Sequence, residues 1–298
     1  MRLFYCDDHT IPLPPGHKFP SEKYRLLRNL LTSSGGFQFQ AAPYASRETI
    51  ELIHDPEYVG RFLDGGIDPR IMRRIGFPWS PELVRRTLAS VGGTLCATQD
   101  ALERGAGGNL AGGTHHAFRR EGAGFCVFND IAIAIRNLLA QGRIRRAAVV
   151  DLDVHQGDGT AQLFMDEPGV LTLSLHGGSN FPFHKQTSGI DVTFSDGTGD
   201  EEYLDALDKT LPRVFDFRPE IVFYQSGVDA LASDRLGRLA LTLDGMKRRD
   251  RAVFAGCKEQ RIPVTITLGG GYSEPISLTV EAHANTFREA LAAGLAAA

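Results

Sequence analysis

The chain of 298 residues lacks the features that mark membrane, exported and nucleic-acid-binding proteins. Its apolar runs fall well short of the roughly 20 residues needed to cross a membrane, and its N-terminus has no apolar segment of the signal-peptide type. Like charges do not gather in blocks, and the net charge of −4 disfavours nucleic acid as the main partner. We therefore expect a cytoplasmic protein with neither nucleic acid nor membrane among its partners.

Cysteine is also scarce. The four cysteines (Cys6, Cys96, Cys126 and Cys257) are far apart and form no C-x-x-C pair, so we expect reduced thiols. The rest of the composition is ordinary for a globular protein, with 42% hydrophobic and 23% charged residues. The length allows one α/β domain or two smaller ones. Because no repeat, linker or change of composition divides the chain, we expect a single domain over residues 1–298.

Helical patterns and short apolar runs alternate along the chain. Apolar residues recur at three- and four-residue spacing in six segments: Ser21–Leu31, Ser80–Arg104, Asn129–Gln141, Glu202–Phe215, Asp244–Gln260 and Ser277–Ala297. Apolar runs typical of strands are Val170–Leu175, Ile221–Tyr224 and Val264–Leu268. This alternation predicts an α/β fold with a mostly parallel sheet and helices on both faces. The glycine-rich segments Gly105–Gly113 and Gly177–Gly199 are expected to be loops.

The segment Ala147–Thr160 (AAVVDLDVHQGDGT) is the most informative stretch. Its apolar start is typical of a parallel strand that is buried on both faces. Asp151, Asp153 and His155 follow at a spacing of two, and along an extended chain such residues project from one face. Open α/β sheets bind ligands at the carboxyl ends of their strands, where a divalent metal would stabilise such a cluster.

Two histidines follow a pair of glycines in Asn109–Ala117 (NLAGGTHHA). On a loop bent at the glycines, His115 and His116 can both reach one cleft and transfer protons there. Asp151 and Asp158 can orient the two imidazoles through their second nitrogens. An isolated pair of this kind is more often two surface histidines, so this interpretation depends on the other motifs.

Two further segments end in polar residues. Ile221–Leu231 (IVFYQSGVDAL) contains Asp229, which taken alone is often only a helix N-cap. Thr267–Tyr272 (TLGGGY) leads through a glycine-rich turn to Tyr272, whose hydroxyl can donate to a developing oxyanion. Asp229 completes a set of three metal ligands with the aspartate and histidine of the Asp153–His155 segment. Three protein ligands leave a position for water, as in catalytic metal sites.

Four segments in sequence order resemble the histone deacetylase family: GGTHHAFRREGAGFCVFND, VVDLDVHQGDGTAQLF, SGVDAL and LGGGY. The match extends from about Phe4 to beyond Tyr272, and the segments IGFPWS and EEYLDAL are most similar to the class IV branch and its bacterial relatives. The resemblance implies the arginase/deacetylase fold, a three-layer αβα architecture around a central, mostly parallel sheet of eight strands. It also implies a zinc-dependent hydrolase that removes acetyl or longer fatty-acyl groups from lysine-type amines.

The resemblance also assigns roles to residues. The zinc ligands that it implies, with Fe²⁺ as an alternative metal, are Asp153, His155 and Asp229. The catalytic residues that it implies are the general base and acid His116 with Asp158, its electrostatic partner His115 with Asp151, and Tyr272. The residues that it implies for the acyl-lysine tunnel are Gly124, Phe125, Gly270 and, on the opposite wall, Phe181 or Phe183. The residues that it implies for a structural potassium ion are Asp151, Asp153, His155, Ser174 and Leu175.

Several alternatives stay open. Gln156 stands where familiar histone deacetylases have a second histidine, and their rim aspartate has no clear counterpart. The substrate is therefore an acylated lysine peptide or protein, an acetylpolyamine, or another small acylated amine. A binuclear ureohydrolase of the arginase type needs a second aspartate two residues after Asp229, where Leu231 stands. A non-catalytic module that binds acyl-lysine is the remaining alternative, although every role in the mechanism is filled.

Overall fold

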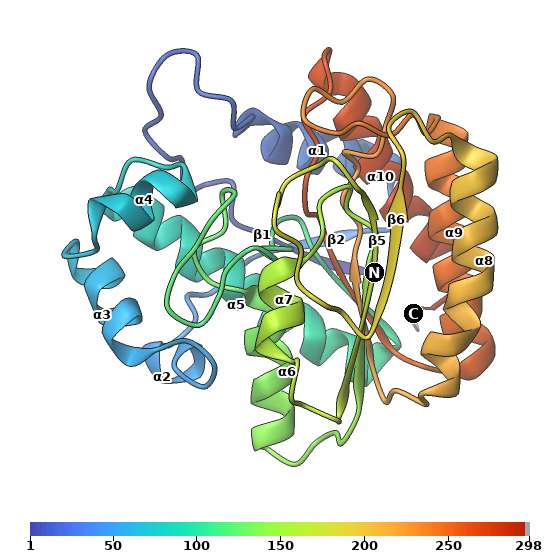
Figure 1. Ribbon diagram of the computed structural model, residues 1–298, viewed down its shortest axis with the longest axis horizontal. Coiled ribbons are helices and arrows are strands. Elements are labelled where there is room, and N and C mark those ends of the chain that lie inside the picture. The colour runs from blue at the N-terminus through green and yellow to red at the C-terminus, as the bar shows by residue number, and fades with distance from the viewer. Residues whose placement is uncertain (296–298) are drawn as a thin grey trace.

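The computed structural model describes residues 1–295 and contains one eight-stranded sheet with helices on both faces (Figure 1). The strands lie in the order β2-β1-β3-β8-β7-β4-β5-β6, and all seven neighbouring pairs are parallel. This arrangement confirms the predicted three-layer αβα fold with eight strands. The sheet is parallel throughout rather than mostly parallel, because every connection between neighbouring strands is a crossover.

The four strands in the middle of the sheet are short and buried along their whole length. The strands are β1 (Arg2–Tyr5), β2 (Gln38–Ala41), β3 (Ala106–Asn109), β4 (Ala147–Asp151), β5 (Val170–Gly177), β6 (Ile190–Phe194), β7 (Val222–Gln225) and β8 (Val264–Thr267). Strands β3, β8, β7 and β4 are covered on both faces, which accounts for the apolar sequences of β4 and β7.

Strand β3 corrects one expectation, because Gly105–Gly113 is not entirely a loop. Its sequence AGGN has no β-branched residue, so its pattern does not predict a strand. The helix that precedes β3 packs directly against its backbone, and a Cβ on Gly107 would lie 1.9 Å from the carbonyl oxygen of Ala97. The second predicted loop, Gly177–Gly199, is likewise interrupted by the edge strand β6.

The helices form one layer on each face of the sheet. They are α1 (Glu22–Ser34), α2 (Arg47–Ile50), α3 (Pro56–Asp64), α4 (Pro69–Ile75), α5 (Pro81–Arg104), α6 (Asp130–Ala140), α7 (Asp158–Leu163), α8 (Asp200–Asp216), α9 (Leu243–Gln260) and α10 (Ile276–Ala292). Helices α1, α8, α9 and α10 contact one another in one layer, and α5, α6 and α7 make the other (Figure 1). Helices α2, α3 and α4 extend this second layer sideways.

The six predicted helices are present as α1, α5, α6, α8, α9 and α10. The last one ends at Ala292 rather than Ala297, and residues 296 and 297 of the predicted range lie outside the described residues. The short helices α2, α3, α4 and α7 were not predicted. Two of them begin at Asp-Pro pairs, in which Asp55 or Asp68 caps the helix and a proline follows, so a helix-start signal was present.

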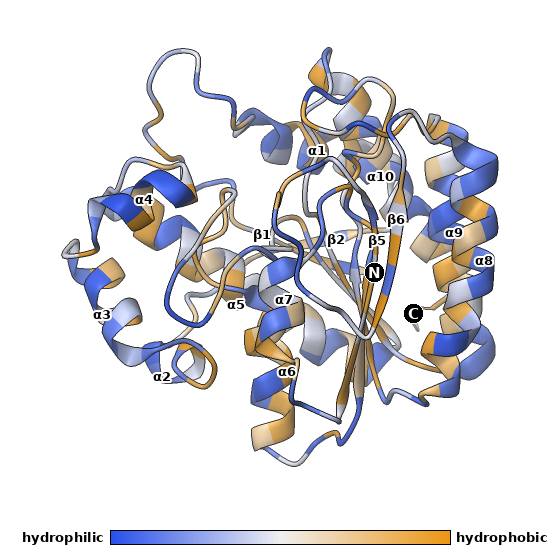
Figure 2. Ribbon diagram, in the orientation of Figure 1, coloured by the Kyte–Doolittle hydropathy of each residue, from blue (hydrophilic) through white to orange (hydrophobic). Residues whose placement is uncertain are grey.

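The apolar core has two parts, one on each face of the sheet. Figure 2 shows that the helices turn their hydrophobic sides toward the sheet and their hydrophilic sides outward. This pattern is what a helix layer needs in order to bury one apolar stripe against a sheet. Within residues 1–295, no helix combines the length and the apolar character that crossing a membrane requires.

Candidate active site

Four loops meet at the carboxyl edge of the sheet. They follow β3, β4, β7 and β8, which are neighbours in the sheet although they are far apart in the sequence. One cavity of about 290 Å³ is lined by six residues predicted as catalytic groups or metal ligands: His115, His116, Asp153, His155, Asp229 and Tyr272. The structure therefore brings together the side chains that the four motifs predict to converge.

The loop after β4 bends sooner than the sequence pattern suggests. Strand β4 ends at Asp151, so Asp153 and His155 do not lie on an extended strand, which corrects that expectation. Carboxylates turn the chain instead: the backbone N–H of Asp153 donates to Asp151 Oδ1 at 3.2 Å, and that of His155 donates to Asp153 Oδ1 at 2.9 Å. These local hydrogen bonds bring the side chains to one place.

Asp153, His155 and Asp229 form the candidate metal centre. Each offers one ligand atom, and these three atoms lie within 4.8 Å of one another. His155 Nδ1 lies 3.0 Å from Asp153 Oδ1 and 3.1 Å from Asp229 Oδ2. Burial alone would lower the pKa of His155, but the two carboxylates raise it to about 10. Two carboxylates and an imidazole that converge in a buried place are a donor set that fits Zn²⁺ or Fe²⁺.

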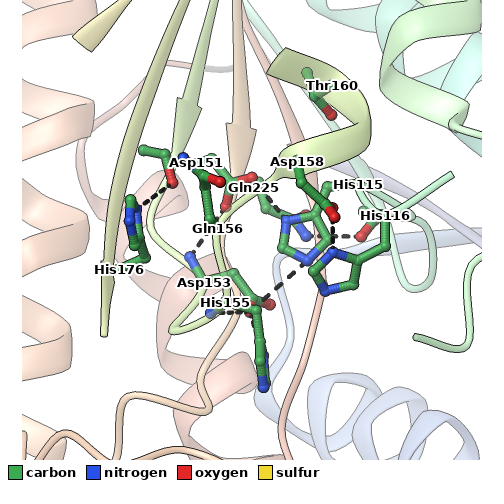
Figure 3. Close-up of polar contacts among 12 residues, drawn as sticks. His115, His116, Asp151, Asp153, His155, Gln156, Asp158, Thr160, His176 and Gln225 are labelled. Carbon is green, nitrogen blue, oxygen red and sulfur yellow. Dashed lines mark hydrogen bonds and ion pairs between the residues drawn. The ribbon is translucent and has the colours of Figure 1, made fainter. Parts of the chain in front are cut away.

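Each of the two adjacent histidines is paired with its own carboxylate (Figure 3). His115 Nδ1 lies 2.7 Å from Asp151 Oδ2, and His116 Nδ1 lies 2.6 Å from Asp158 Oδ1. All four side chains are buried, and the imidazole centroids are 4.1 Å apart. The predicted pairings are therefore present, and the carboxylates fix which ring nitrogen faces the cavity.

The surroundings shift the pKa values of the two histidines in opposite directions. Burial alone would lower both pKa values, but the charges of Asp151 and Asp153 raise the pKa of His115 to about 9. Burial and the adjacent His115 charge lower the pKa of His116 to about 4, although Asp158 opposes this effect. The protein groups alone therefore favour the protonated form of His115 and the neutral form of His116, whose Nε2 then has a free lone pair.

The loop that carries the histidines is held by two residues that the sequence reasoning missed. Asp130, in the first turn of α6, accepts the backbone N–H groups of Gly113 at 3.0 Å and of Thr114 at 2.7 Å, and two threonine hydroxyls besides. Gln225 Nε2 donates to the carbonyl of Gly113 at 2.7 Å. Asp130 lies in the FND segment directly before an apolar helix, which was the available signal; Gln225 carried none.

Tyr272 is placed by the glycine-rich loop after β8. Its backbone N–H donates to Asp234 Oδ2 at 2.6 Å, and the N–H of Gly270 donates to Asp153 Oδ2 at 2.7 Å. A Cβ on Gly270 would lie 1.8 Å from a carboxylate oxygen of Asp229, so only glycine fits beside the metal ligands. Burial raises the pKa of Tyr272 well above its ordinary value, so its hydroxyl stays protonated and can donate.

The four predicted tunnel residues all line the cavity: Gly124, Phe125, Phe181 and Gly270. Of the two candidates for the second wall, Phe181 packs edge-on against His116 with ring centroids 4.9 Å apart. Phe183 also lines the cavity, but it is 80% exposed at the outside. The inner wall is therefore Phe181. That the four tunnel residues hold an acyl-lysine remains a prediction.

The residues predicted for potassium lie next to the metal centre. Ser174 of β5 is paired in register with Asp151 of β4, and both are buried. The Ser174 hydroxyl shares a 3.0 Å hydrogen bond with Nδ1 of His176. Leu175 follows Ser174 in the same strand. The potassium ion stays a prediction.

Comparison of the fold identifies the structural class. The structure of an HDAC homologue from Aquifex aeolicus superposes with a TM-score of 0.83 at 24% identity, over 97% of this chain and 83% of that one. At this identity the likeness shows the fold alone. Residues 17–287 match the family model described as "Histone deacetylase domain". The chain therefore belongs to the histone deacetylase family.

Sequence relatives include bacterial and plant proteins. An uncharacterized protein of Picosynechococcus is 44% identical over 97% of both chains. Histone deacetylase 2 of Arabidopsis thaliana is 33% identical over 86% of this chain and 70% of its own length. A histone deacetylase-like amidohydrolase of Pseudomonas aeruginosa is 31% identical over 88% of this chain and 74% of its own length. The family resemblance expected from the four motifs is confirmed.

Proposed function

We propose that the protein is a metal-dependent amidohydrolase that removes acyl groups from lysine-type amines. One observation carries this proposal: the donor cluster of Asp153, His155 and Asp229 shares a cavity with His116 and Tyr272. Membership of a family whose relatives are named deacetylases and amidohydrolases supports it. We propose Zn²⁺ as the metal. Fe²⁺ is the alternative, because the donor set contains no thiolate, the ligand that would favour the softer Zn²⁺.

A metal held by Asp153, His155 and Asp229 supplies Lewis-acid activation of a water molecule at neutral pH. His116 is the neutral imidazole, and Asp158 holds its Nδ1–H, so Nε2 accepts the proton that the attacking water loses. His116 then donates this proton to the leaving amine. General base and acid catalysis of this kind contributes roughly 10²–10⁴-fold to the rate.

His115 and Tyr272 act on the negative charge that develops at the carbonyl oxygen. The pairing with Asp151 favours the protonated form of His115, and in that form it would stabilise an anion in the pocket. Tyr272 donates its hydroxyl hydrogen to the oxyanion, and loss of one such donor costs about 10²–10³-fold in kcat. Every proton transfer in this mechanism therefore has a named residue.

The charge of the cavity favours lysine-type substrates over acetylpolyamines. Histidines apart, the charged residues that line it in the described chain are Asp153, Asp229 and Arg238. The two aspartates belong to the metal centre. Arg238 is 55% exposed, and its Nη1 contacts Ser179 at 3.3 Å and Asp196 at 3.4 Å. A polyamine would bring further positive charge toward this guanidinium, with no cavity carboxylate outside the metal centre to receive it.

A substrate panel tests this proposal. Peptides with acetyl-, octanoyl- or myristoyl-lysine and an acetylpolyamine are offered to the native protein, Tyr272→Phe and Arg238→Glu. We expect turnover of a lysine peptide that falls about 10²–10³-fold in Tyr272→Phe. In Arg238→Glu we expect the acetylpolyamine to gain relative to the peptides. The matched control is Arg235→Glu, an exposed arginine near Glu274 that does not line the cavity.

Three other results would contradict the proposal. Preferred turnover of the acetylpolyamine by the native protein would identify the second candidate, a small-molecule deacetylase. No turnover of any substrate with one metal bound would favour the non-catalytic binding module. Full activity of Tyr272→Phe would remove the oxyanion role from that residue.

A further inference from the structure

Gln156 directly follows the candidate metal ligand His155, and its side chain is 1% exposed (Figure 3). Its amide bonds to a single peptide unit from both sides: Oε1 accepts the backbone N–H of Gln186 at 2.8 Å, and Nε2 donates to the carbonyl of Gln186 at 2.7 Å. Nε2 also donates to Asp191 Oδ1 at 2.9 Å. The amide of Gln156 thus pairs with the backbone of Gln186 in the way that a neighbouring strand would.

Gln186 belongs to the segment that connects β5 to β6, residues 178–189, which we call the Phe181 loop (Figure 1). In the described chain, both backbone polar groups of Gln186 bond to Gln156 and to no other residue. The first half of the loop has a separate attachment, because Asn180 Nδ2 donates to the carbonyl of Leu236 at 2.8 Å. Farther along, the N–H groups of Ser188 and Gly189 donate to Asp191 and Thr172, so Gln156 is the contact that holds the loop at Gln186 itself.

Lys185 connects this attachment to the cavity wall. It precedes Gln186, and its ammonium group donates to the carbonyl of Asn180 at 2.6 Å and to that of Pro182 at 2.7 Å. These two carbonyls flank Phe181, whose ring packs against His116. Hydrogen bonds at each end, joined by the peptide link between Lys185 and Gln186, thus connect Gln156 to the backbone on both sides of Phe181.

The chemistry of the connection requires a neutral primary amide. A peptide unit presents one donor and one acceptor side by side, and a glutamine amide presents the complementary pair. A carboxylate only accepts, so it would leave the Gln186 carbonyl unpaired and would face the Asp191 carboxylate. The two nitrogens of an imidazole diverge and cannot serve both groups of one peptide.

We propose that Gln156 is a positioning residue that holds Phe181 at the cavity and thereby sets which acyl groups fit. This inference rests on the proposed function for its substrate and on geometry for its mechanism. Displacement of an aromatic wall changes the fit of a long acyl chain and of an acetyl group by different amounts. Loss of the Gln156 hydrogen bonds therefore changes the ratio of kcat/KM for octanoyl-lysine and acetyl-lysine peptides.

Two variants test the inference. Gln156→Met keeps the length of the side chain without its hydrogen bonds, and Gln156→Glu keeps its shape without its donors. We expect each to change the octanoyl-to-acetyl ratio of kcat/KM by about tenfold or more, because pocket fit discriminates acyl groups on this scale. Lys185→Met should change it in the same direction. The matched control, Gln141→Met on the exposed end of α6, should leave the ratio unchanged.

A double-mutant cycle shows whether Gln156 acts through Phe181. In a Phe181→Ala background the wall is gone, so Gln156→Met should no longer change the ratio. Metal content and the visible spectrum of the Co²⁺-substituted protein should stay those of the native protein. An equal fall in activity toward both substrates with loss of metal would overturn the inference, because Gln156 would then only support His155.

Hydrogen exchange gives a readout that needs no activity. Loss of the Gln156 acceptor should make the amide of Gln186 exchange at least about tenfold faster, with little change elsewhere in the core. Unchanged exchange at Gln186 would overturn the positioning role on its own. If the native protein hydrolyses no acyl-lysine peptide while Gln186 exchange responds as expected, the proposed function fails and the attachment of the loop stands.

Discussion

At the scale of single residues, neighbours decide what a side chain can do. His115 and His116 are adjacent and equally buried, yet the carboxylates beside His115 raise its pKa, whereas burial and the charge of His115 lower the pKa of His116. The sequence motif predicted the pair, and the difference between their pKa values supports the two roles that we propose for them, electrostatic stabilisation and proton transfer.

Loss of His116 should therefore strongly reduce catalysis. His116→Ala removes the base, and we expect kcat to fall by about 10²–10⁴-fold. Asp158→Asn should reduce kcat by less, because His116 stays in place and only the orientation and the pKa of its ring are disturbed. Steady-state kinetics at equal metal content provide the measurement. A variant without His116 that keeps native kcat would show that another group accepts the proton.

His54 is a buried residue whose effect concerns stability rather than catalysis. Its Nδ1 faces the carbonyl of Phe118 at 2.9 Å, and its Nε2 accepts the N–H of Asn129 at 2.9 Å, so the bonded form is the neutral imidazole. Burial lowers the pKa of His54 from 6.5 to about 4. Asn129 caps α6, the helix that carries Asp130. His54 therefore supports the helix end to which the loop with His115 and His116 is attached.

The unfolding free energy should therefore fall in mild acid. The pKa of His54 is lower in the folded chain than in the unfolded chain. Between these two pKa values the unfolded chain therefore binds a proton at His54 that the folded chain does not bind. The stabilisation is complete above about pH 6.5, and up to about 3 kcal/mol is lost as the pH falls toward 4. His54→Gln, which keeps a donor and an acceptor, should make this decline shallower. Denaturant unfolding at several pH values measures the unfolding free energy. The same dependence on pH in the native protein and in His54→Gln would contradict the role given to His54.

At the scale of elements, the sequence predicted what regular patterns specify. The long helices α5, α6 and α9 and the apolar strands β4 and β7 follow their periodicity. The local sequence does not predict strand β3, because its glycines are required by the close packing of α5 rather than by a strand pattern. The edge strands β2 and β6 have mostly polar or exposed residues, so they also lack an apolar run.

The candidate site was predictable to the extent that its residues follow strands in recognisable motifs. Asp153, Asp229 and Tyr272 have this property. Asp130, Gln225 and the function of Gln156 do not, because each acts on a loop that is distant in the sequence. Which loops meet at the carboxyl edge depends on the strand order, and that order appears only in the folded chain.

The attachment of the histidine loop to α6 gives a prediction at this scale. Asp130→Ala leaves the buried N–H of Gly113 and neighbouring donors unpaired, so we expect the unfolding free energy to fall by about 2–4 kcal/mol. The displaced histidines should lower kcat more than they raise KM. Asp205→Ala on the exposed side of α8 is the control, because its pair with Lys209 lies at the surface. Native stability of Asp130→Ala would show that the loop is held by other contacts.

At the scale of the whole molecule, a parallel sheet collects the site from four separate parts of the chain. Strands β3, β8, β7 and β4 are adjacent, and the loops at their carboxyl ends supply the histidines, the tyrosine and the three candidate ligands. The solved HDAC homologue of Aquifex aeolicus shares this fold. A metal that binds only the folded chain should also stabilise it, because its ligands come from two different loops.

Metal dependence is the central claim, and a titration tests it most directly. The protein is freed of metal with a chelator, and Zn²⁺ or Fe²⁺ is added stepwise while hydrolysis of an acetyl-lysine peptide and metal binding are measured. The account predicts that chelation abolishes activity, that one equivalent restores it, and that Asp229→Asn neither binds the metal tightly nor recovers. Activity that survives chelation, or that returns only at two equivalents, would contradict it.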